Sequence, residues 1–502
     1  MADIVLTGDT SGSITVAAPA VAGTNTLTLP ATTGTVTITS TGGVDSNTGL
    51  GDGTFDANTT GANNVAVGKD ALAANTTGSN TTAVGSKSLL LQTTGHSNTA
   101  MGYKSGTDLS TATGNALFGI RAGQNITTGV ANTFIGGSYS SYVGNANTSG
   151  SYNTALGSDA LSANTSASNN TATGFGALRA NTTGSLNTAV GKSALATNQT
   201  GGDNAAFGSG ALATSTGSRN TALGYNSMTA TTTGANNVAV GAGSLSANTT
   251  ANDNTAVGRD ALANNTTGAT NTAVGNSALY LNNSGSDLTA LGKNALYNNT
   301  TGANNVAVGR SALTVNTTAS FNTAVGYNAL VANTTGANNT AIGDRALSLT
   351  TTGNNNIGIG EYAQSSSATS SGQCTLGSSN ISNLRCNDTS ISSLSDARDK
   401  TNVQDIPLGL DFVNQMRPVS FDWNRRDGSY KGKKDFGFIA QELKEIQDKT
   451  DYADHIRLVK DENPEKLEAD PMKTYPVLVK AIQELSAKVE ELQTEIKTLK
   501  GN

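Results

Sequence analysis

The stretch from Gly258 to Gly275 reads GRDALANNTTGATNTAVG, and it decides the fold because the same pattern recurs along most of the chain. A glycine that closes a run like Asn-Thr-Ala-Val-Gly marks each of 19 copies. Of the 18 intervals between these glycines, sixteen are 17 residues long, one is 21 and one is 16. Self-similarity this regular predicts a solenoid or another stacked array. The marker glycines are Gly51, Gly68, Gly85, Gly102, Gly119, Gly136, Gly157, Gly174, Gly191, Gly208, Gly224, Gly241, Gly258, Gly275, Gly292, Gly309, Gly326, Gly343 and Gly360.

Each repeat unit predicts its own short elements. The residue before the marker glycine is usually apolar and often large, as in Val257, and the residue before that is nearly always small, as in Ala256. This alternation predicts a short strand with two unlike faces. The pair Ala261-Leu262 is a second apolar contact, either in another short strand or in a single helical turn. The following Asn-Thr-Thr-Gly run supplies turn residues, with the glycine free to take a positive φ.

A single unit cannot bury a core, because it offers only about two large apolar side chains. Stacked coils place like residues on like residues, and association of several chains would close the remaining apolar edge. With one coil per repeat and strands ~4.8 Å apart, the shaft over residues 47–360 would be roughly 90 Å long. The competing interpretation is a disordered linker rich in Thr, Asn and Gly. It is disfavoured because the repeat keeps a nearly constant spacing along the whole shaft. The unit resembles the shorter head repeats of trimeric autotransporters and the repeats of bacteriophage fibres, which implies a trimeric parallel β-roll or a similar interlocked solenoid.

The one long interval carries an aromatic insertion. Four extra residues enter between Gly136 and Gly157, and this stretch contains Tyr139, Tyr142 and Tyr152. Inserted loops on solenoids often carry binding, so the three tyrosines are candidates for contact with a receptor. The alternative is a bulge in one coil that has no role.

Charge and composition separate the shaft from the end of the chain. Residues 1–390 hold 15 acidic and 12 basic side chains, whereas the last 112 residues hold 21 and 18. The net charge of −6, without a long run of one sign, favours neither nucleic acid nor an anionic membrane as a partner. No apolar run approaches the ~18 residues of a membrane span, so no membrane insertion is expected.

Cysteine and histidine are too scarce for a disulfide framework or a predictable metal site, and no cofactor is expected. The two cysteines, Cys374 and Cys386, are expected to be free thiols or, alternatively, a link between neighbouring chains. The two histidines, His96 and His455, lie far apart in the sequence.

The two segments that flank the shaft differ in kind. Residues 1–46 predict a small β module, because short runs alternate around Pro19, Pro30 and Gly34. The apolar residues of these runs are Ile14 and Val16, Leu27 and Leu29, and Val36 and Ile38. The block at residues 18–30 looks like N-terminal segments of phage tail-fibre proteins, which implies docking to tail or baseplate proteins. Residues 361–394 form a Ser-rich, Cys-containing connector.

A third segment, residues 395–502, opens with Ser395-Asp396-Ala397-Arg398-Asp399-Lys400. Two further apolar runs follow, at residues 416–423 and 436–443. The end of the chain predicts a coiled-coil helix over residues 477–500. Motif, order and terminal helix together resemble the endosialidase-type intramolecular chaperone, a self-cleaving C-terminal domain of phage tailspikes and fibres.

This resemblance implies a reaction. Ser395 would be the nucleophile, Lys400 the general base, and the bond between Leu394 and Ser395 the one that is cut, in a single-turnover serine self-peptidase. A lysine acts as a base only if burial or a nearby cation lowers its pKa from ~10.4. Arg398 is a candidate for that cation once a trimer has closed around the site. The expected role of Asp396 and Arg398 is to orient the loop rather than to perform chemistry.

The pattern of the terminal helix does not by itself settle how many chains associate. Its core positions alternate Ile or Val with Leu, which favours two strands, whereas the chaperone resemblance implies three. The apolar positions are Leu478, Ile482, Leu485, Val489, Leu492, Ile496 and Leu499. We side with three, since the shaft also needs several chains.

The sequence therefore predicts a mainly β, homotrimeric fibre of stacked 17-residue repeats, β-roll or solenoid-like, followed by a small α+β chaperone domain. The expected function is a virion tail fibre that is assembled in the cytoplasm of the bacterial host and contacts a receptor on the cell surface. One alternative is a tailspike that degrades glycan, which needs a pair of carboxylates roughly 5–9 Å apart. The other is a bacterial trimeric adhesin, which the absence of a recognisable secretory signal disfavours.

Overall fold

The computed structural model describes residues 4–7, 13–16, 38–39, 46–138, 140–378, 381, 396–424, 431–461 and 467–501. Near the start of the chain, β1 (Ile4–Thr7) pairs antiparallel with β2 (Ser13–Val16). The strand β3 (Ile38–Thr39) pairs antiparallel with β4 (Thr48–Leu50), the first strand of the shaft. The expected strands around Ile14 and Ile38 are therefore present, whereas Leu27, Leu29 and Val36 lie outside the described residues.

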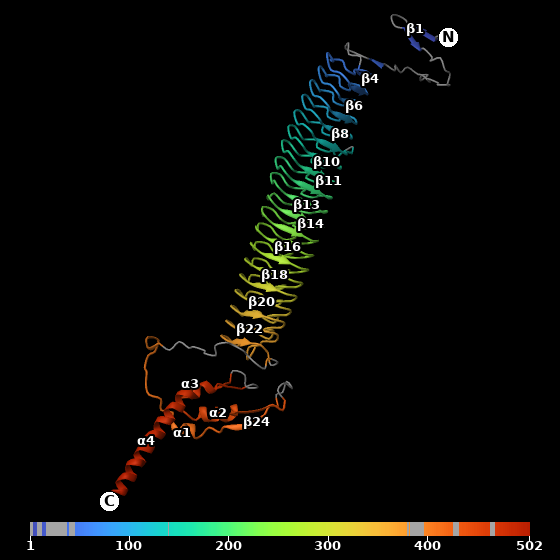
Figure 1. The fold of residues 1–502 in the computed structure, drawn as a ribbon. Coiled ribbons are helices and arrows are strands. Elements are labelled where there is room, and N and C mark those ends of the chain that lie inside the picture. The colour runs from blue at the N-terminus through green and yellow to red at the C-terminus, as the bar shows by residue number, and fades with distance from the viewer. Residues whose placement is uncertain are drawn as a thin grey trace.

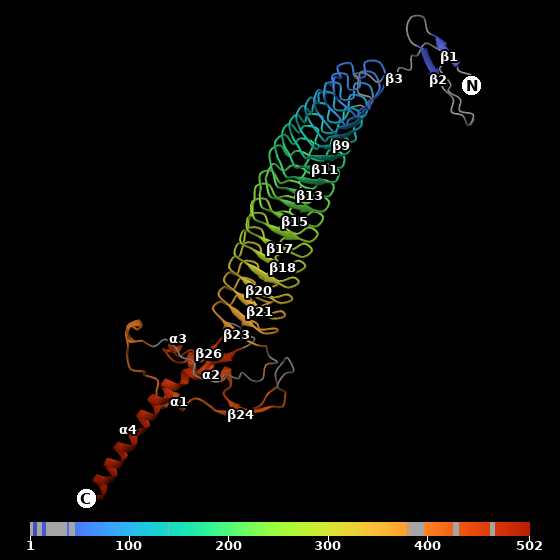
Figure 2. The same ribbon diagram turned by 45° about the horizontal axis from the view of Figure 1, so that its top comes forward.

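The shaft is a ladder of twenty three-residue strands, one for each coil. Figures 1 and 2 show the coils stacked along one axis into a long rod. The strands after β4 are β5 (Val65–Val67), β6 (Thr82–Val84), β7 (Thr99–Met101), β8 (Ala116–Phe118), β9 (Thr133–Ile135), β10 (Thr154–Leu156), β11 (Thr171–Thr173), β12 (Thr188–Val190), β13 (Ala205–Phe207), β14 (Thr221–Leu223), β15 (Val238–Val240), β16 (Thr255–Val257), β17 (Thr272–Val274), β18 (Thr289–Leu291), β19 (Val306–Val308), β20 (Thr323–Val325), β21 (Thr340–Ile342), β22 (Ile357–Ile359) and β23 (Cys374–Leu376).

Neighbouring strands pair in parallel and in register with the repeat. Ala256 stands beside Ala273, and Val257 beside Val274. Backbone bonds join the coils on both sides of each strand. The Thr255 N–H donates to the Asn271 carbonyl at 2.8 Å, and the Gly275 N–H to the Val257 carbonyl at 2.7 Å. The prediction of a mainly β solenoid with one coil per repeat is confirmed.

The ladder also runs one coil further than the marker glycines of the sequence. The strand β23 begins at Cys374, pairs in parallel with β22, and lies within the segment 361–394 that we expected to be a connector. The Ser370 carbonyl accepts a bond from Asn356 at 2.8 Å, as the glycine carbonyl does in earlier coils. The stacking bonds persist here because the backbone forms them, although the sequence pattern has faded.

The core of each coil is built from small residues on the strand and a leucine opposite them. The middle strand residue, for example Ala256, is fully buried, as are Ala261 and Leu262 from the following turn. The residues on either side of Ala256 point outward. The predicted strand with two unlike faces is therefore present, and its inner face carries the small side chain.

The Ala-Leu pair lies in neither a strand nor a helical turn, so both alternatives considered from the sequence were wrong. Leu262 has a φ of +52°, and the same position is left-handed in most coils. Two consecutive turns flank it, closed by Ala261 N–H to the Gly258 carbonyl and Asn265 N–H to the Leu262 carbonyl. A left-handed residue ends any helix, and the burial of the leucine side chain offsets the strain.

Two columns of buried asparagines hold the coils together from inside. In one column, the Asn282 side-chain amide donates to the Asn265 side-chain oxygen at 2.8 Å and to the Gly285 carbonyl at 2.9 Å. In the other, Asn271 accepts from the Leu288 N–H at 3.0 Å and donates to the Gly285 carbonyl at 2.9 Å. Buried polar groups cost stability unless they are paired, and neighbouring coils pair these amides along both columns, with Asn333 Oδ1 an unpaired exception.

The coils before and at the insertion keep their core volume by exchange between facing positions. Where Gly123 and Gly144 replace the usual leucine, the strands carry Leu117 and Phe134 in place of alanine. A Cβ on Gly144 would lie 2.3 Å from the Phe134 ring, and one on Gly123 would lie 2.9 Å from Leu117. The four inserted residues leave the ladder intact, because Thr133 still stands beside Thr154.

Alanine in place of a marker glycine is expected to destabilise the shaft. At Gly258 φ is +129°, and a Cβ would lie 2.6 Å from the Gly275 carbonyl oxygen. A strained backbone of this kind costs on the order of 1–3 kcal/mol, and the close contact adds to it. Gly258→Ala should therefore lower the midpoint of thermal unfolding followed by circular dichroism.

The matched control for that variant is Gly176→Asn. Gly176 has a φ of +65°, the region that Asn226 adopts at the same position of a later coil, and the nearest atom to a Cβ there would be Ser193 Oγ at 3.9 Å. Asparagine tolerates this conformation, so the control should melt close to the unchanged chain. If both variants had the same midpoint of thermal unfolding, the close approach of neighbouring coils would be refuted as the reason why a glycine recurs at the marker position.

The C-terminal region is a small α/β unit followed by a long helix. Its elements are η1 (Ala397–Asp399), α1 (Leu410–Val413), β24 (Val419–Asp422), β25 (Lys434–Gly437), α2 (Ala440–Asp448), α3 (Ala453–Ile456), β26 (Val459–Lys460), β27 (Glu468–Ala469), η2 (Pro471–Lys473) and α4 (Thr474–Lys500). The pairs β24–β25 and β26–β27 are antiparallel. A separate core contains Phe412, Leu443, Leu458 and Val477. The described helices include none that is long and apolar enough to cross a membrane.

Candidate functional site

The described part of the candidate cleavage motif is a capped turn. Asp396 precedes η1, and its side chain accepts a bond from the Arg398 backbone N–H at 2.9 Å. The Arg398 guanidinium also binds the same carboxylate, with Nη2 to Oδ2 at 2.6 Å and Nε to Oδ1 at 3.0 Å. These side-chain bonds, followed by the backbone bond, hold the pKa of the Asp396 carboxyl below its usual value.

Lys400 ends this turn. Its backbone N–H donates to the Ala397 carbonyl at 3.3 Å, and its side chain is exposed. Arg398, the candidate cation beside Lys400 in an assembled trimer, is paired with Asp396 in the single chain. Ser395 and Leu394 lie outside the described residues, so the turn shows how the chain is shaped between the two predicted catalytic positions but not their distance.

The candidate receptor residues occupy the long coil and the turn after it. Tyr142 receives a hydrogen bond from Arg121 at 3.0 Å, and the guanidinium lies 4.9 Å from the centre of the Tyr142 ring. Tyr152 is 62% exposed and has a φ of +58°, which is unusual for a bulky residue. Tyr139 lies outside the described residues. The sequence analysis missed Arg121, although its separation from Tyr142 equals the 21-residue interval.

Cys374 is a free, exposed thiol on β23, while Cys386 lies outside the described residues. Among the residues that the structure describes, no three His, Cys, Asp or Glu side chains gather closely enough to hold a metal ion. His96 accepts a bond from the Ser79 N–H at 3.1 Å, which is one of the bonds that join successive coils.

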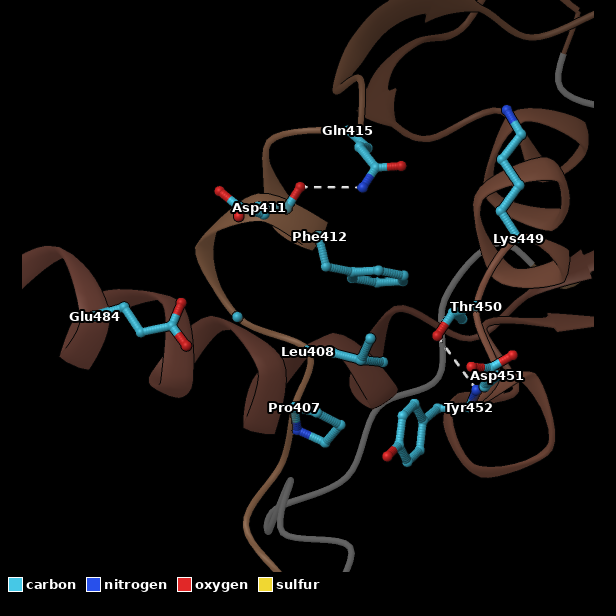
Figure 3. A pocket seen from close by; sticks show the side chains of 11 residues that line it. Pro407, Leu408, Asp411, Phe412, Gln415, Lys449, Thr450, Asp451, Tyr452 and Glu484 are labelled. Carbon is cyan, nitrogen blue, oxygen red and sulfur yellow. Dashed lines mark hydrogen bonds between the residues drawn. The ribbon is translucent and has the colours of Figure 1, made fainter.

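A polar pocket of about 420 Å³ lies beside the start of α1 (Figure 3). The Glu484 carboxylate accepts a bond from the Leu410 N–H at 2.7 Å, so a residue of α4 satisfies the first turn of α1. Phe412 and Leu408 lie in the middle of the view, and Tyr452 approaches from the opposite side. Glu484 therefore fixes the long helix to the body of the region, a contact with no signal in the sequence.

The long helix α4 has two different parts. Near its start, Val477 and Ala481 are buried in the core of the C-terminal region. Beyond them, an apolar stripe stays exposed, with Ile482 at 62% and Leu499 at 77%. The stripe comprises Leu478, Ile482, Leu485, Val489, Leu492, Ile496 and Leu499, with intervals of four and three residues. Such a spacing of apolar residues is typical of a coiled-coil seam.

Comparison with known proteins finds a family match in the C-terminal region. Residues 395–452 match the protein-family model described as "Chaperone of endosialidase". The match begins at Ser395, the residue after the predicted cleavage point, and includes Asp396, Arg398 and Lys400. No curated protein and no solved structure matches the chain. A solenoid shaft of stacked 17-residue coils, followed by this match, fits a bacteriophage tail fibre or tailspike-like protein that ends in an endosialidase-type chaperone domain.

Proposed function

We propose that the protein is a homotrimeric phage tail fibre whose C-terminal domain aligns three chains and then separates from the shaft by self-cleavage. The exposed apolar stripe of α4 carries this proposal, together with the family match at residues 395–452. Three such stripes would pack into a parallel coiled coil and bring three chains together at the same residue. The α4 pattern of Ile or Val alternating with Leu favours two chains by itself, and the family favours three.

The proposed alignment answers a physical difficulty of the shaft. Its coils are nearly identical, so two chains displaced by one coil would make almost the same contacts. Pairing of long-range repeats is slow and prone to register errors. A helix that fixes the ends of the chains before the shaft folds removes this ambiguity.

The proposed cleavage uses Ser395 and Lys400. Lys400 in its neutral form takes the proton from Ser395 Oγ, and Oγ attacks the carbonyl carbon of Leu394. The bond from that carbon to the Ser395 nitrogen breaks, the nitrogen takes up the proton, and an ester remains. Water then hydrolyses the ester, which leaves a carboxylate on Leu394 and restores the Ser395 hydroxyl. Asp396 and Arg398 act as positioning residues through the capped turn.

We further propose that residues 1–46 dock the fibre to tail or baseplate proteins, and that the shaft contacts a receptor on the host cell. The long coil with Tyr139, Tyr142 and Tyr152 is the proposed contact, since inserted loops on solenoids often carry binding. The fibre would be assembled in the host cytoplasm and function in the virion.

Binding to intact host cells tests the attachment function. The purified mature fibre should bind cells without releasing reducing sugar, and Tyr142→Ala with Tyr152→Ala should weaken binding by about tenfold, as loss of an interface hot spot does. Tyr225→Ala is the matched control, because Tyr225 is 64% exposed on another coil. Release of reducing sugar would favour a glycan-degrading tailspike, and equal binding of all variants would refute the tyrosine contact.

A further inference from the structure

The outward residues of the shaft strands form a continuous surface, which we call the outer strand face. It consists of the first and third residues of every strand from β4 to β23. The first position is mostly threonine, as in Thr272, and the third is apolar in every strand except β11, where it is Thr173. Every residue at the third position is partly or fully exposed, and Leu376 reaches 54%. The larger third-position side chains are Leu50, Met101, Phe118, Ile135, Leu156, Phe207, Leu223, Leu291, Ile342, Ile359 and Leu376.

Charge is absent from this face. The twenty described strands contain no Asp, Glu, Lys or Arg, although the coils between them contain all four. The charged side chains stand in the turns, for example Arg259 and Asp260, directly after the marker glycine. A solvent-exposed strand row is usually protected by charges, in particular by lysine. Their exclusion from twenty successive strands indicates that this surface is covered.

The size of the face indicates what covers it. Twenty strands ~4.8 Å apart extend about 90 Å, and two outward columns with their side chains are about 10 Å wide, which gives on the order of 900 Å². The apolar third-position column makes up about half of this area, roughly 450 Å², which is already as large as the largest apolar patch of about 300–600 Å² on a typical monomer. A stable protein interface buries about 800 Å² on each partner. A partner of the same length, running along the whole shaft, would match this area.

We propose that the outer strand face is where further copies of the same chain pack, so that the strands of each shaft face the interior of the fibre and the charged turns face water. This inference rests on the proposed association of chains through α4 and names the surface that the shaft uses for it. A second copy has the required length, the same 17-residue spacing and the same uncharged face. Thr272 and Val274, on β17, would lie within this interface.

The polar side of the coil supports this orientation. The Asn-Thr-Thr-Gly turns, which lie between the buried leucine of each coil and the next strand, carry hydroxyls that bond from coil to coil along the shaft. Thr249 Oγ1 donates to the Thr266 carbonyl at 3.1 Å, and Thr300 Oγ1 donates to the Thr317 carbonyl at 3.0 Å. The turns offer polar and charged side chains, whereas the outer strand face offers its apolar column, so the outer strand face is the surface that gains most from being covered.

Charges placed on the face test the proposal. Val257→Lys with Val274→Lys puts two cations on adjacent strands, and burying them against other copies is unfavourable. The mature shaft of this variant should then associate more weakly. It should need a protein concentration at least about tenfold higher than the unchanged shaft to stay associated, as measured by sedimentation. The matched control is Ala242→Lys with Asn276→Lys, in turn positions where other coils carry Lys293 or Arg259. The control should associate as the unchanged shaft does.

A second measurement does not depend on the stability of the variants. Cys374 is an exposed thiol in the first column of the face. In a Cys386→Ser chain, a short bismaleimide should join chains covalently through Cys374. In a Cys374→Ser, Cys386→Ser, Asn276→Cys chain, whose only thiol lies in a turn on the charged side, it should not.

The outcomes separate this proposal from the proposed function. If the unchanged shaft were a single chain in solution, both would fail. If the shaft associated, but the face variant associated equally well and Cys374 did not cross-link, the face would be refuted while the trimeric fibre remained. If the face variant associated normally and lost only its binding to host cells, the face would be a receptor surface, which overturns the proposal.

Discussion

A Ser395→Ala chain is expected to remain at its full length of 502 residues, whereas the unchanged chain is expected to separate into residues 1–394 and 395–502. Alanine offers no oxygen to attack the carbonyl of Leu394, so self-cleavage should fall by at least about 100-fold. Denaturing gels with intact-mass measurement distinguish the two products. Because only the hydroxyl is lost, the uncleaved chain should still assemble.

Two further variants make the result specific. Ser393→Ala, two residues away, should be cut as the unchanged chain is. Lys400→Arg keeps the positive charge but has a pKa too high to serve as a base near neutral pH, so it should stay uncut. Cleavage of the Ser395→Ala chain at the same bond would show that another group, or an external protease, performs the reaction.

Charges on the α4 stripe are expected to abolish assembly of the soluble shaft. Ile482→Asp with Val489→Asp would bury carboxylates at the centre of the coiled coil, which costs several kcal/mol for each chain. Without an aligned C-terminal helix, the three shafts lose the element that fixes their register. We expect the chain to aggregate or to remain unassembled, as measured by sedimentation of the soluble fraction.

The matched control carries the same charges on the other side of the helix. Gln483→Asp with Ala487→Asp changes two exposed positions of α4 outside the stripe. This chain should assemble in normal yield, because its carboxylates remain in water. Normal assembly of the Ile482→Asp, Val489→Asp chain would contradict the role of α4 in association.

The solenoid was predictable because its signals are periodic. The marker glycines gave the coil length, and the alternation around Ala256 gave a strand with two unlike faces, although not which of them lies inside. The reversal at Leu262 was not predictable, since leucine rarely adopts a positive φ and no local signal announces it. Only the cross-section of the coil, where a leucine must reach the strand alanines, accounts for it.

Other features depend on contacts between distant parts of the chain. The compensation of the small Gly144 by the large Phe134 could not be predicted, because the two residues face each other only when the coils are stacked. The bond from Leu410 to Glu484 joins residues 74 positions apart, and no local pattern predicts it. In the candidate cleavage motif, the sequence identified Ser395 and Lys400 by residue type and spacing, but the pairing of Arg398 with Asp396 is a matter of geometry.

The size and C-terminal residue of the assembled fibre test the central claim most directly. Native mass spectrometry of the purified fibre, followed by denaturation and measurement of the intact chain, reports both values in one experiment. We expect three chains per particle, each ending at Leu394, together with a separate fragment that begins at Ser395. Particles with one chain, or chains that still carry Ser395 and the residues after it, would contradict a chaperone that aligns three chains and is then cut away.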